Sequence, residues 1–230
     1  MLERIQSFAA LAAVLALTGC ASETVFQSNF DATPPGQPPA HAQAVGTANI
    51  DGPPGSVIVI DPPVTPSGRW VQISRPEGPQ FTAGLQGVFP AQRGHGVYTF
   101  TATIFMPSSF KGIATIQFEP MNQPIHDPQG FLHVDLMQDN RVRIDDDEST
   151  TFGSFQRDQP FIVQVRLNIG DTSTAHISLS GAATDNGSRD VTISPVLRPV
   201  VDQFGAVRVW MGFPWVGIFD ATNIVVTYGT

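Results

Sequence analysis

The sequence predicts an all-β domain of antiparallel strands, and three observations support this fold class. Apolar and polar residues alternate with period two in many segments, as half-buried strands require. Clusters of Gly, Pro, Asp and Asn separate these segments at short intervals. Beyond the N-terminal apolar run, no window shows the periodicity of an amphipathic helix. Together they predict a sandwich or barrel of roughly a dozen strands.

Four segments show the alternation most clearly. In VYTFTATIFM (97–106) the apolar residues alternate with threonines, and in PFIVQVRLNIG (160–170) they alternate with Gln, Arg and Asn. The next segment, TAHISLSG (174–181), follows after a short turn, so the pair is expected to form a hairpin. GAVRVWMGF (205–213) places Val207 and Val209 on one face of a strand, with Arg208 and Trp210 on the other.

The N-terminus has the pattern of an export signal. An apolar run, FAALAAVLAL, precedes the tetrapeptide LTGC, which ends at Cys20. The run is too short for a membrane helix, which needs about 20 apolar residues, but it has the length of a signal-peptide core. LTGC resembles the bacterial lipoprotein signal, in which the Cys sulfur is lipidated and the chain is cleaved before it. We therefore expect residues 1–19 to be a signal peptide; the alternative is an ordinary secretory signal with an incidental cysteine.

Lipidation also explains cysteine usage, because Cys20 is the only cysteine in the chain. Ala21 follows it, whereas Asp in that position is the usual inner-membrane retention signal of enterobacterial lipoproteins. This resemblance implies an exported protein anchored to the outer membrane, on either its periplasmic or its surface face. With a formal charge of -8 and a single lysine, Lys111, the chain is not expected to bind nucleic acid or anionic lipid headgroups.

The composition predicts a tether followed by one domain. Residues 20–24 are expected to form the lipid-anchored tether, and residues 25–230 a single β-sandwich domain. The first part of that domain, about 31–66, is rich in proline, which favours extended chain over helix. Two apolar runs, 25–30 and 56–60, are expected to be strands within or beside it.

Three segments resemble the concanavalin A-like, laminin-G-like jelly-roll family. NFDATPPGQPP (29–39) is similar to its first strand and turn, the predicted hairpin 160–181 to its central hairpin, and FDATNIVVTYG (219–229) to its last strand. The resemblance implies a two-sheet antiparallel sandwich. It also implies that ligands lie on the concave outer face of one sheet.

Alternation predicts which polar side chains face outward on the strands. Polar groups beside an aromatic ring are what a sugar site requires, because hydroxyls need donors and acceptors and sugar rings stack on aromatic faces. The alternative is that they form the ordinary polar face of a sandwich. The candidate ligand-binding residues are Gln117, Glu119, His133, Asp135, Arg143, Gln164, Arg166, Arg208 and Trp210.

A hydrolase is the first catalytic alternative. The endo-glucanases of the family carry Glu-x-Asp-x-x-Glu on one strand, but here the nearest string begins His133-Val134-Asp135 and lacks both Glu positions. Glu119 and Asp135, with His133 beside them, could act only if their strands are neighbours, since retaining hydrolysis needs two carboxyl groups about 5 Å apart.

A polysaccharide lyase is the second catalytic alternative. Gln117, His133, Arg166 and Tyr98 are similar in type to the residues of alginate-lyase sites, although the motifs of that family are missing.

No cofactor is predicted, and a structural calcium ion is a weak alternative. The acidic segment IDDDESTTFG (144–153) lacks the ligand spacing of an EF-hand loop. Asp31 and Asp220 could contribute to a jelly-roll calcium site, because the first and last strands of such folds often meet. Otherwise both residues cap turns.

The acidic stretch FLHVDLMQDNRVRIDDDE (131–148) is predicted to be a hairpin. A three-residue loop, 138–140, would place Leu136 opposite Val142 and keep the apolar residues on one face. The same register places Asp135 opposite Arg143 and predicts a cross-strand charge pair there, with a second between His133 and Asp145.

Three functions are compatible with the sequence. The favoured one is a lipid-anchored, non-catalytic envelope module that binds a glycan or another envelope ligand. The second is a polysaccharide-cleaving enzyme. The third is a structural lipoprotein that binds an envelope protein partner near Phe213-Pro214-Trp215.

Overall fold

The computed structural model describes residues 22–64, 68–78, 81–121, 123 and 129–230. The expected signal peptide and Cys20 lie outside the described residues, so cleavage and lipidation stay predictions. Among the described residues, no helix has the length and apolar character needed to cross a membrane.

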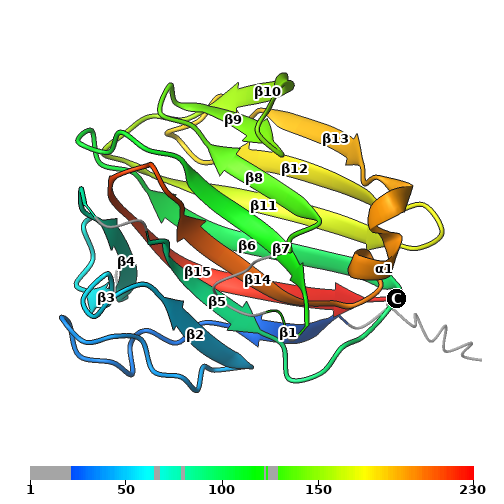
Figure 1. Cartoon of the computed structure of the whole chain (residues 1–230), viewed down its shortest axis with the longest axis horizontal. Helices are drawn as coiled ribbons and strands as arrows, with labels where there is room; N and C mark the ends of the chain where they lie inside the picture. Colours follow the sequence, from blue (N-terminus) through cyan, green and yellow to red (C-terminus); the bar gives the residue numbers. More distant parts are fainter. Residues whose placement is uncertain (1–21, 65–67, 79–80, 122, 124–128) are drawn as a thin grey trace, which may run out of the picture.

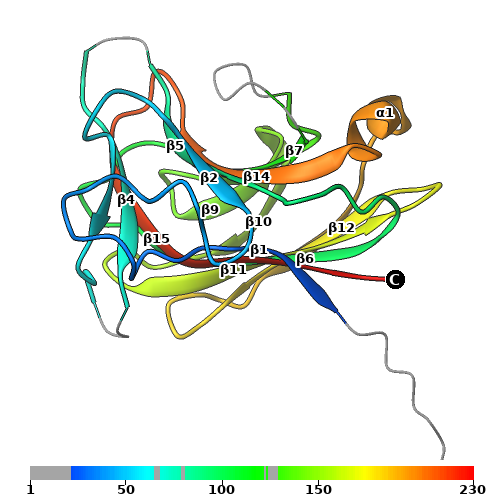
Figure 2. The ribbon, with the colours of Figure 1, turned by 90° about the horizontal axis from the view of Figure 1, so that it is seen from below.

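The described chain forms two antiparallel sheets that pack face to face, which confirms the predicted fold class (Figures 1 and 2). In sheet A the order is β13 (Ser188–Thr192), β12 (Thr174–Ser180), β11 (Pro160–Ile169), β6 (Gly96–Phe105), β15 (Gly217–Gly229), β4 (Trp70–Arg75) and β3 (Val57–Ile60), and β1 (Glu23–Gln27) also pairs with β15. In sheet B the order is β10 (Asp147–Ser154), β9 (Arg141–Ile144), β8 (Leu132–Leu136), β7 (Ala114–Pro120), β14 (Phe204–Met211), β5 (Ala83–Val88) and β2 (Thr47–Asp51).

Among the described residues, the helical content that the sequence did not predict is confined to one connection. A 3-10 turn, η1 (Pro195–Leu197), and one turn of helix, α1 (Arg198–Val201), link β13 to β14. This link carries the chain from the edge of sheet A to the middle of sheet B, at one end of the sandwich (Figure 1).

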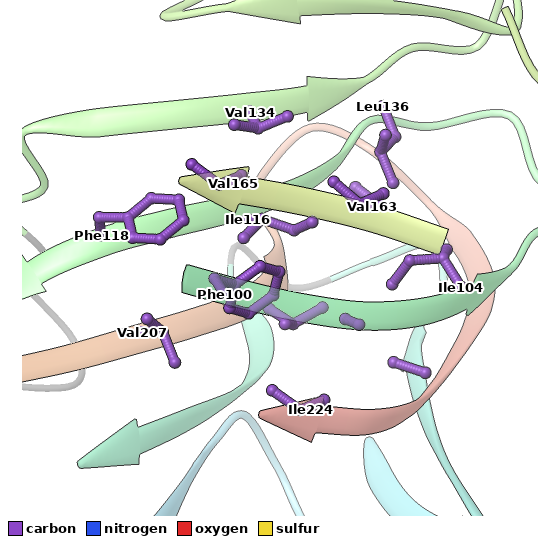
Figure 3. Packing of buried hydrophobic residues seen from close by; sticks show 14 of the residues in the cluster. Phe100, Ile104, Ile116, Phe118, Val134, Leu136, Val163, Val165, Val207 and Ile224 are labelled. Carbon is purple, nitrogen blue, oxygen red and sulfur yellow. The ribbon is translucent and has the colours of Figure 1, made fainter. Parts of the chain in front are cut away.

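The core lies between the sheets and consists of the inward residues of the predicted alternation. Phe100 of β6 and Phe118 of β7 meet edge to face, with ring centroids 5.6 Å apart. Other residues of the two layers fill the space around this pair (Figure 3): Ile104, Val163, Val165 and Ile224 from sheet A, and Ile116, Val134, Leu136 and Val207 from sheet B. Burying one such side chain stabilises the fold by about 1.5–3 kcal/mol.

The strands predicted from the sequence are confirmed where alternation was clearest. β11 and β12 form the expected hairpin, with Val165 opposite Ile177. On β14, Val207 and Val209 are buried in the core, while Arg208 and Trp210 lie on the other face of the strand. The run 56–60 corresponds to β3, which pairs with β4 at the edge of sheet A.

The hairpin of β8 and β9 has the predicted register. Leu136 lies opposite Val142, and Asn140 takes the left-handed conformation, with φ 66°, in the predicted loop. Asp135 lies opposite Arg143.

The predicted charge pairs of this hairpin were wrong. Arg143 instead directs Nη2 toward Glu148, at 3.5 Å, and toward Asp139, at 3.9 Å. The short Asp135 side chain stays buried, whereas the long Arg143 side chain can reach carboxylates nearer to solvent. Asp145 accepts a hydrogen bond from the backbone N–H of His133 at 2.8 Å and not from its ring.

Asp31 and Asp220, the weak calcium candidates, have separate partners. Asp31 Oδ1 accepts a hydrogen bond from the backbone N–H of Arg69 at 2.7 Å. Asp220 Oδ1 accepts one from Gln72 Nε2 at 3.2 Å, across the β15–β4 pair. In the described part of the chain, no group of three or more His, Cys, Asp or Glu residues is arranged to hold a metal ion.

Burial gives Asp220 a pH-dependent effect on stability. Burial raises the pKa of Asp220 to about 6, and the hydrogen bond from Gln72 opposes the rise. Because the folded-state pKa lies above the unfolded value, ionisation disfavours the folded state, and stability is lost as pH rises from about 4 through about 6.

Asp220→Asn removes this ionisation. Relative to the wild type, we expect the variant to gain roughly 3 kcal/mol in unfolding free energy between about pH 4 and pH 7. Urea unfolding at several pH values measures the difference. A difference that does not change with pH would contradict the prediction.

Candidate functional site

The outer face of sheet B carries a continuous band of polar side chains. Strand pairing places one row side by side across five strands: Asn49, Gln86, Arg208, Gln117 and His133. A second row, two residues along each strand, contains Asp51, Trp210, Thr115, Asp135 and Arg143. We call these two rows, with Glu119, the polar band. Opposed residues in such rows have Cβ atoms about 4.5–5.5 Å apart, so each row can act as one surface.

The middle of the polar band is a buried charge network. Arg208 and Glu119 are fully buried, with Arg208 Nε 3.2 Å from Glu119 Oε1. Arg208 Nη1 also lies 3.6 Å from Asp51 Oδ2. Gln86 Nε2 donates to Glu119 Oε2 at 2.6 Å, and Asn49 Nδ2 donates to Gln86 Oε1 at 3.0 Å. These contacts link β2, β5, β14 and β7.

Burial shifts the pKa values of two residues in this network, Glu119 and Arg208. Burial raises the pKa of Glu119, and the Arg208 charge and the Gln86 hydrogen bond oppose the rise. Burial lowers the pKa of Arg208, and the charges of Glu119 and Asp51 oppose that change. Glu119 and Arg208 therefore each favour the charged form of the other, against the effect of burial.

Several polar atoms beside the network have no hydrogen-bond partner among the described residues. They are both side-chain amide atoms of Gln117, His133 Nε2 and Trp210 Nε1. Each such buried atom costs about 1–3 kcal/mol, so native proteins rarely keep one without a functional reason. A Cβ on Gly130 would lie 2.5 Å from Gln117 Cγ and 2.6 Å from His133 Nε2, so the Gly130 backbone lies directly against these two side chains.

A hollow of about 150 Å³ opens at the Trp210 end of the polar band. We call it the aromatic pocket. Three aromatic residues, two carboxylates and one imidazole contribute to its wall. It is lined by Ile113, Thr115, His133, Asp135, Asp146, Trp210, Gly212, Phe213 and Trp215.

Arg75 holds the aromatic loop of the pocket in place. Its fully buried side chain donates from Nε to Phe81 O at 2.6 Å and from Nη1 to Trp215 O. The guanidinium group also lies 5.3 Å from the centre of the Phe213 ring, within the range of a cation–π contact. Phe213 is nevertheless 54% exposed, so its ring is available at the rim of the pocket.

Asp135 lies at the base of the pocket with both carboxylate oxygens engaged. Oδ1 accepts from Thr115 Oγ1 at 2.7 Å, and Oδ2 accepts from the backbone N–H of Asp146 at 3.0 Å. Burial raises the pKa of Asp135, and these two hydrogen bonds oppose the rise. Each oxygen keeps a second lone pair for a ligand.

The structure brings together seven of the nine predicted ligand-binding residues. The set on the polar band contains Gln117, Glu119, His133, Asp135, Arg143, Arg208 and Trp210. The other two, Gln164 and Arg166, lie on the exposed outer face of sheet A, opposite Thr101 and Thr99 of β6. The prediction that these two residues share one groove with the other seven is wrong. Alternation shows that a side chain faces outward, but it does not show which sheet its strand joins.

The predicted carboxylate pair of a hydrolase is not formed. β7 and β8 are neighbours, but Asp135 lies opposite Thr115, and Glu119 is four residues further along β7. At about 3.3 Å per residue this offset is roughly 13 Å, compared with the 5 Å of a retaining pair. Glu119 also directs its oxygens toward Gln86 and Arg208, across β14 and away from β8.

The predicted lyase set is likewise not assembled. Arg166 lies on sheet A, and Tyr98 is buried in the core, where its hydroxyl donates to Gly94 O at 2.8 Å. Gln117 and His133 do lie opposite one another on β7 and β8.

Four residues of this face were not predicted from the sequence: Asn49, Asp51, Gln86 and Asp146. Asn49 and Asp51 lie in the proline-rich part of the chain, and Gln86 is a single polar residue in the Gly-containing strand AGLQGV. The sequence signal that could have identified Gln86 is its position as a polar residue between Leu85 and Gly87. Asp146 lies in the turn between β9 and β10, and nothing in the acidic run 145–148 distinguishes it from its neighbours.

Removal of Arg208 is expected to destabilise the fold, because Glu119 and Asp51 would lose their shared buried cation. We predict that Arg208→Met lowers the unfolding free energy by about 3–5 kcal/mol. Adding Glu119→Gln removes one of the uncompensated charges, so the double variant should be more stable than Arg208→Met alone. Urea unfolding of the three proteins measures both effects, and a double variant less stable than the single one would refute the coupling.

Comparison with solved structures places the fold among the legume-lectin-like sandwiches. Lectin I from Ulex europaeus, solved with the methyl glycoside of α-L-fucose, is 13% identical, with a TM-score of 0.51 over 90% of this chain and 98% of the lectin. The lectin from Bauhinia forficata, solved with GalNAc, is 12% identical, with a TM-score of 0.51 over 91% of this chain and 99% of the lectin. The Ca²⁺-bound exoplasmic/lumenal domain of VIP36 has 8% identity and a TM-score of 0.49, over 80% of this chain and 83% of that domain.

No family model and no curated protein matches the sequence. At the identities above, similarity to the two lectins establishes the fold. The expected concanavalin A-like sandwich is confirmed at this level.

Proposed function

We propose that this chain is a non-catalytic glycan-binding module whose ligand lies on the polar band of sheet B and enters the aromatic pocket. The observation that carries the proposal is the meeting of unpartnered polar atoms and aromatic rings on one face. His133 Nε2 and Trp210 Nε1 both lack partners among the described residues, and both residues line the pocket beside Phe213 and Trp215. Sugar hydroxyls supply donors and acceptors for such atoms, and sugar rings pack on aromatic faces.

The fold is compatible with this function, because the two lectins of similar fold were solved with sugars bound. Their sugar preferences do not transfer at 12–13% identity. The hydrolase alternative is weaker, since the offset between Glu119 and Asp135 separates the two candidate carboxylates.

We propose further that the module is exported and anchored to the outer membrane through a lipid on Cys20. The sequence LTGC and the single cysteine support this anchor. The first strand, β1, begins at Glu23, so such a lipid would hold the sandwich within a few residues of the membrane.

Glycan binding can be tested with variants of the pocket rim. Purified protein in detergent micelles is titrated against a panel of soluble polysaccharides by affinity electrophoresis. Trp210→Ala and Phe213→Ala should each weaken binding about tenfold or more, because each removes an aromatic surface that can pack on a sugar ring. The exposed Phe213 provides a variant that leaves the core unchanged.

Arg166→Ala is the matched control, because it removes an outward side chain from the opposite sheet. It should bind as the wild type does. Full binding by both rim variants, with thermal unfolding unchanged, would refute the placement of the site. Failure of the wild type to bind any member of the panel would count against glycan binding itself.

The lipid anchor has a direct test. In cells grown with an alkyne-tagged fatty acid, the wild-type protein should carry the label, and Cys20→Ala should carry none, because it lacks the sulfur to which the lipid is attached. In-gel fluorescence measures the label. Equal labelling of both proteins would exclude Cys20 as the anchor.

A further inference from the structure

We propose that the aromatic pocket binds an ammonium group, so that the module prefers glycans with free amino groups over neutral or acidic ones. This inference rests on the proposed glycan-binding function and names the chemical class of the ligand. It follows from the charges at the pocket, the positions of nearby cations and the size of the hollow.

The charged groups that line the pocket are mainly acidic. Asp135 and Asp146 contribute carboxylates, and His133 contributes an imidazole. No Arg or Lys is among the described residues that line it. A uronate or sulfate placed here would meet two carboxylates, whereas an ammonium group would be attracted to both.

Two of the three guanidinium groups beside the pocket are directed to other carboxylates, and the third, Arg75, donates to the backbone carbonyls of Phe81 and Trp215 behind the aromatic loop. Arg208 lies 3.2 Å from Glu119 and 3.6 Å from Asp51, in the middle of the polar band. Arg143, the cross-strand neighbour of Asp135, lies 3.5 Å from Glu148. Asp135 accepts hydrogen bonds from a hydroxyl and a backbone amide, neither of which carries a charge. A cationic ligand would therefore supply the counter-charge that the pocket does not receive from Arg143 or Arg208.

The aromatic wall strengthens this attraction. Trp210, Phe213 and Trp215 give the pocket an apolar wall, and a lower local dielectric beside such a wall makes the interaction of a carboxylate with an ammonium group stronger. The faces of aromatic rings also attract cations. Arg208, 5.7 Å from the Trp210 ring, and Arg75, 5.3 Å from the Phe213 ring, already occupy one face of two of these rings, so a bound ammonium group would contact Trp215 or the opposite ring faces.

The volume of the pocket limits how much of a glycan can enter. About 150 Å³ is less than the roughly 300–1,000 Å³ of a site for a drug-sized molecule. The pocket therefore suits a single sugar residue and its substituents.

Three β-1,4-linked oligosaccharides of equal length provide a matched test. Oligomers of glucose, N-acetylglucosamine and glucosamine share ring and linkage, and differ at C2 by a hydroxyl, an acetamide or an amino group. Isothermal titration of the full-length lipoprotein in detergent micelles gives the three dissociation constants. We expect the glucosamine oligomer, in its protonated form, to bind about tenfold more tightly than the other two.

Asp135→Asn and Asp146→Asn test the pocket directly. Each variant keeps the size of the side chain and removes its charge, and each should lower the ratio of the glucosamine affinity to the glucose affinity severalfold relative to the wild type. Asp190→Asn, which removes a carboxylate from the exposed edge strand β13 of sheet A, controls for net charge and should keep the preference. An N-trimethylated glucosamine oligomer, with permanent charge, should bind the wild type in the same carboxylate-dependent way.

The outcomes separate this inference from the proposed function. Equal binding of the three oligomers, with loss of binding in Phe213→Ala, would overturn the ammonium preference and leave glycan binding in place. A preference that persists in both Asp variants would also overturn it, because the ammonium group would then be recognised elsewhere. If neither these oligomers nor any polysaccharide of the panel bound, both proposals would fail.

Discussion

Burial of one face of each sheet is the constraint on which the rest of the structure depends. Because side chains alternate between faces, a register slip of one residue would move Phe118 or Val134 into solvent and bring the polar band into the core. The apolar contacts between sheets therefore fix the position of every outward side chain as well. The alignment of Gln117 with both Arg208 and His133 is a consequence of core packing, which acts on residues of the opposite face of the sheet.

The polar band lowers the stability of the fold relative to an apolar face of the same shape. A buried ion network such as that of Arg208, Glu119 and Asp51 contributes little net stability, because desolvation offsets much of the Coulomb attraction. Gln117 adds two amide atoms without described partners, and apolar residues in the same row would avoid both costs. Proteins commonly sacrifice stability at functional sites, so the cost itself is an argument that this face has a role in recognition.

Alternation was enough to predict the fold class and most of the band, but it could not place β11. The pattern of PFIVQVRLNIG identifies Gln164 and Arg166 as outward residues, and both are outward. A sandwich has two outer faces, however, and pairing with β6 places β11 in sheet A. The hairpin 131–148 shows a similar limit. Its register followed from the apolar residues, whereas the contacts of Arg143 depend on side-chain length and on solvent, which no pattern encodes.

Within the band, the charge network and the aromatic pocket have different physical properties. The groups of the network bind one another and are closed to solvent, so a ligand there would have to replace contacts such as that between Gln86 and Glu119. At the pocket, the Phe213 ring is exposed, so a ligand can contact it without breaking a contact of the charge network. Arg75 fixes the aromatic loop before any ligand arrives, which reduces the entropy lost on binding. The pocket is therefore better suited than the network to contact a ligand.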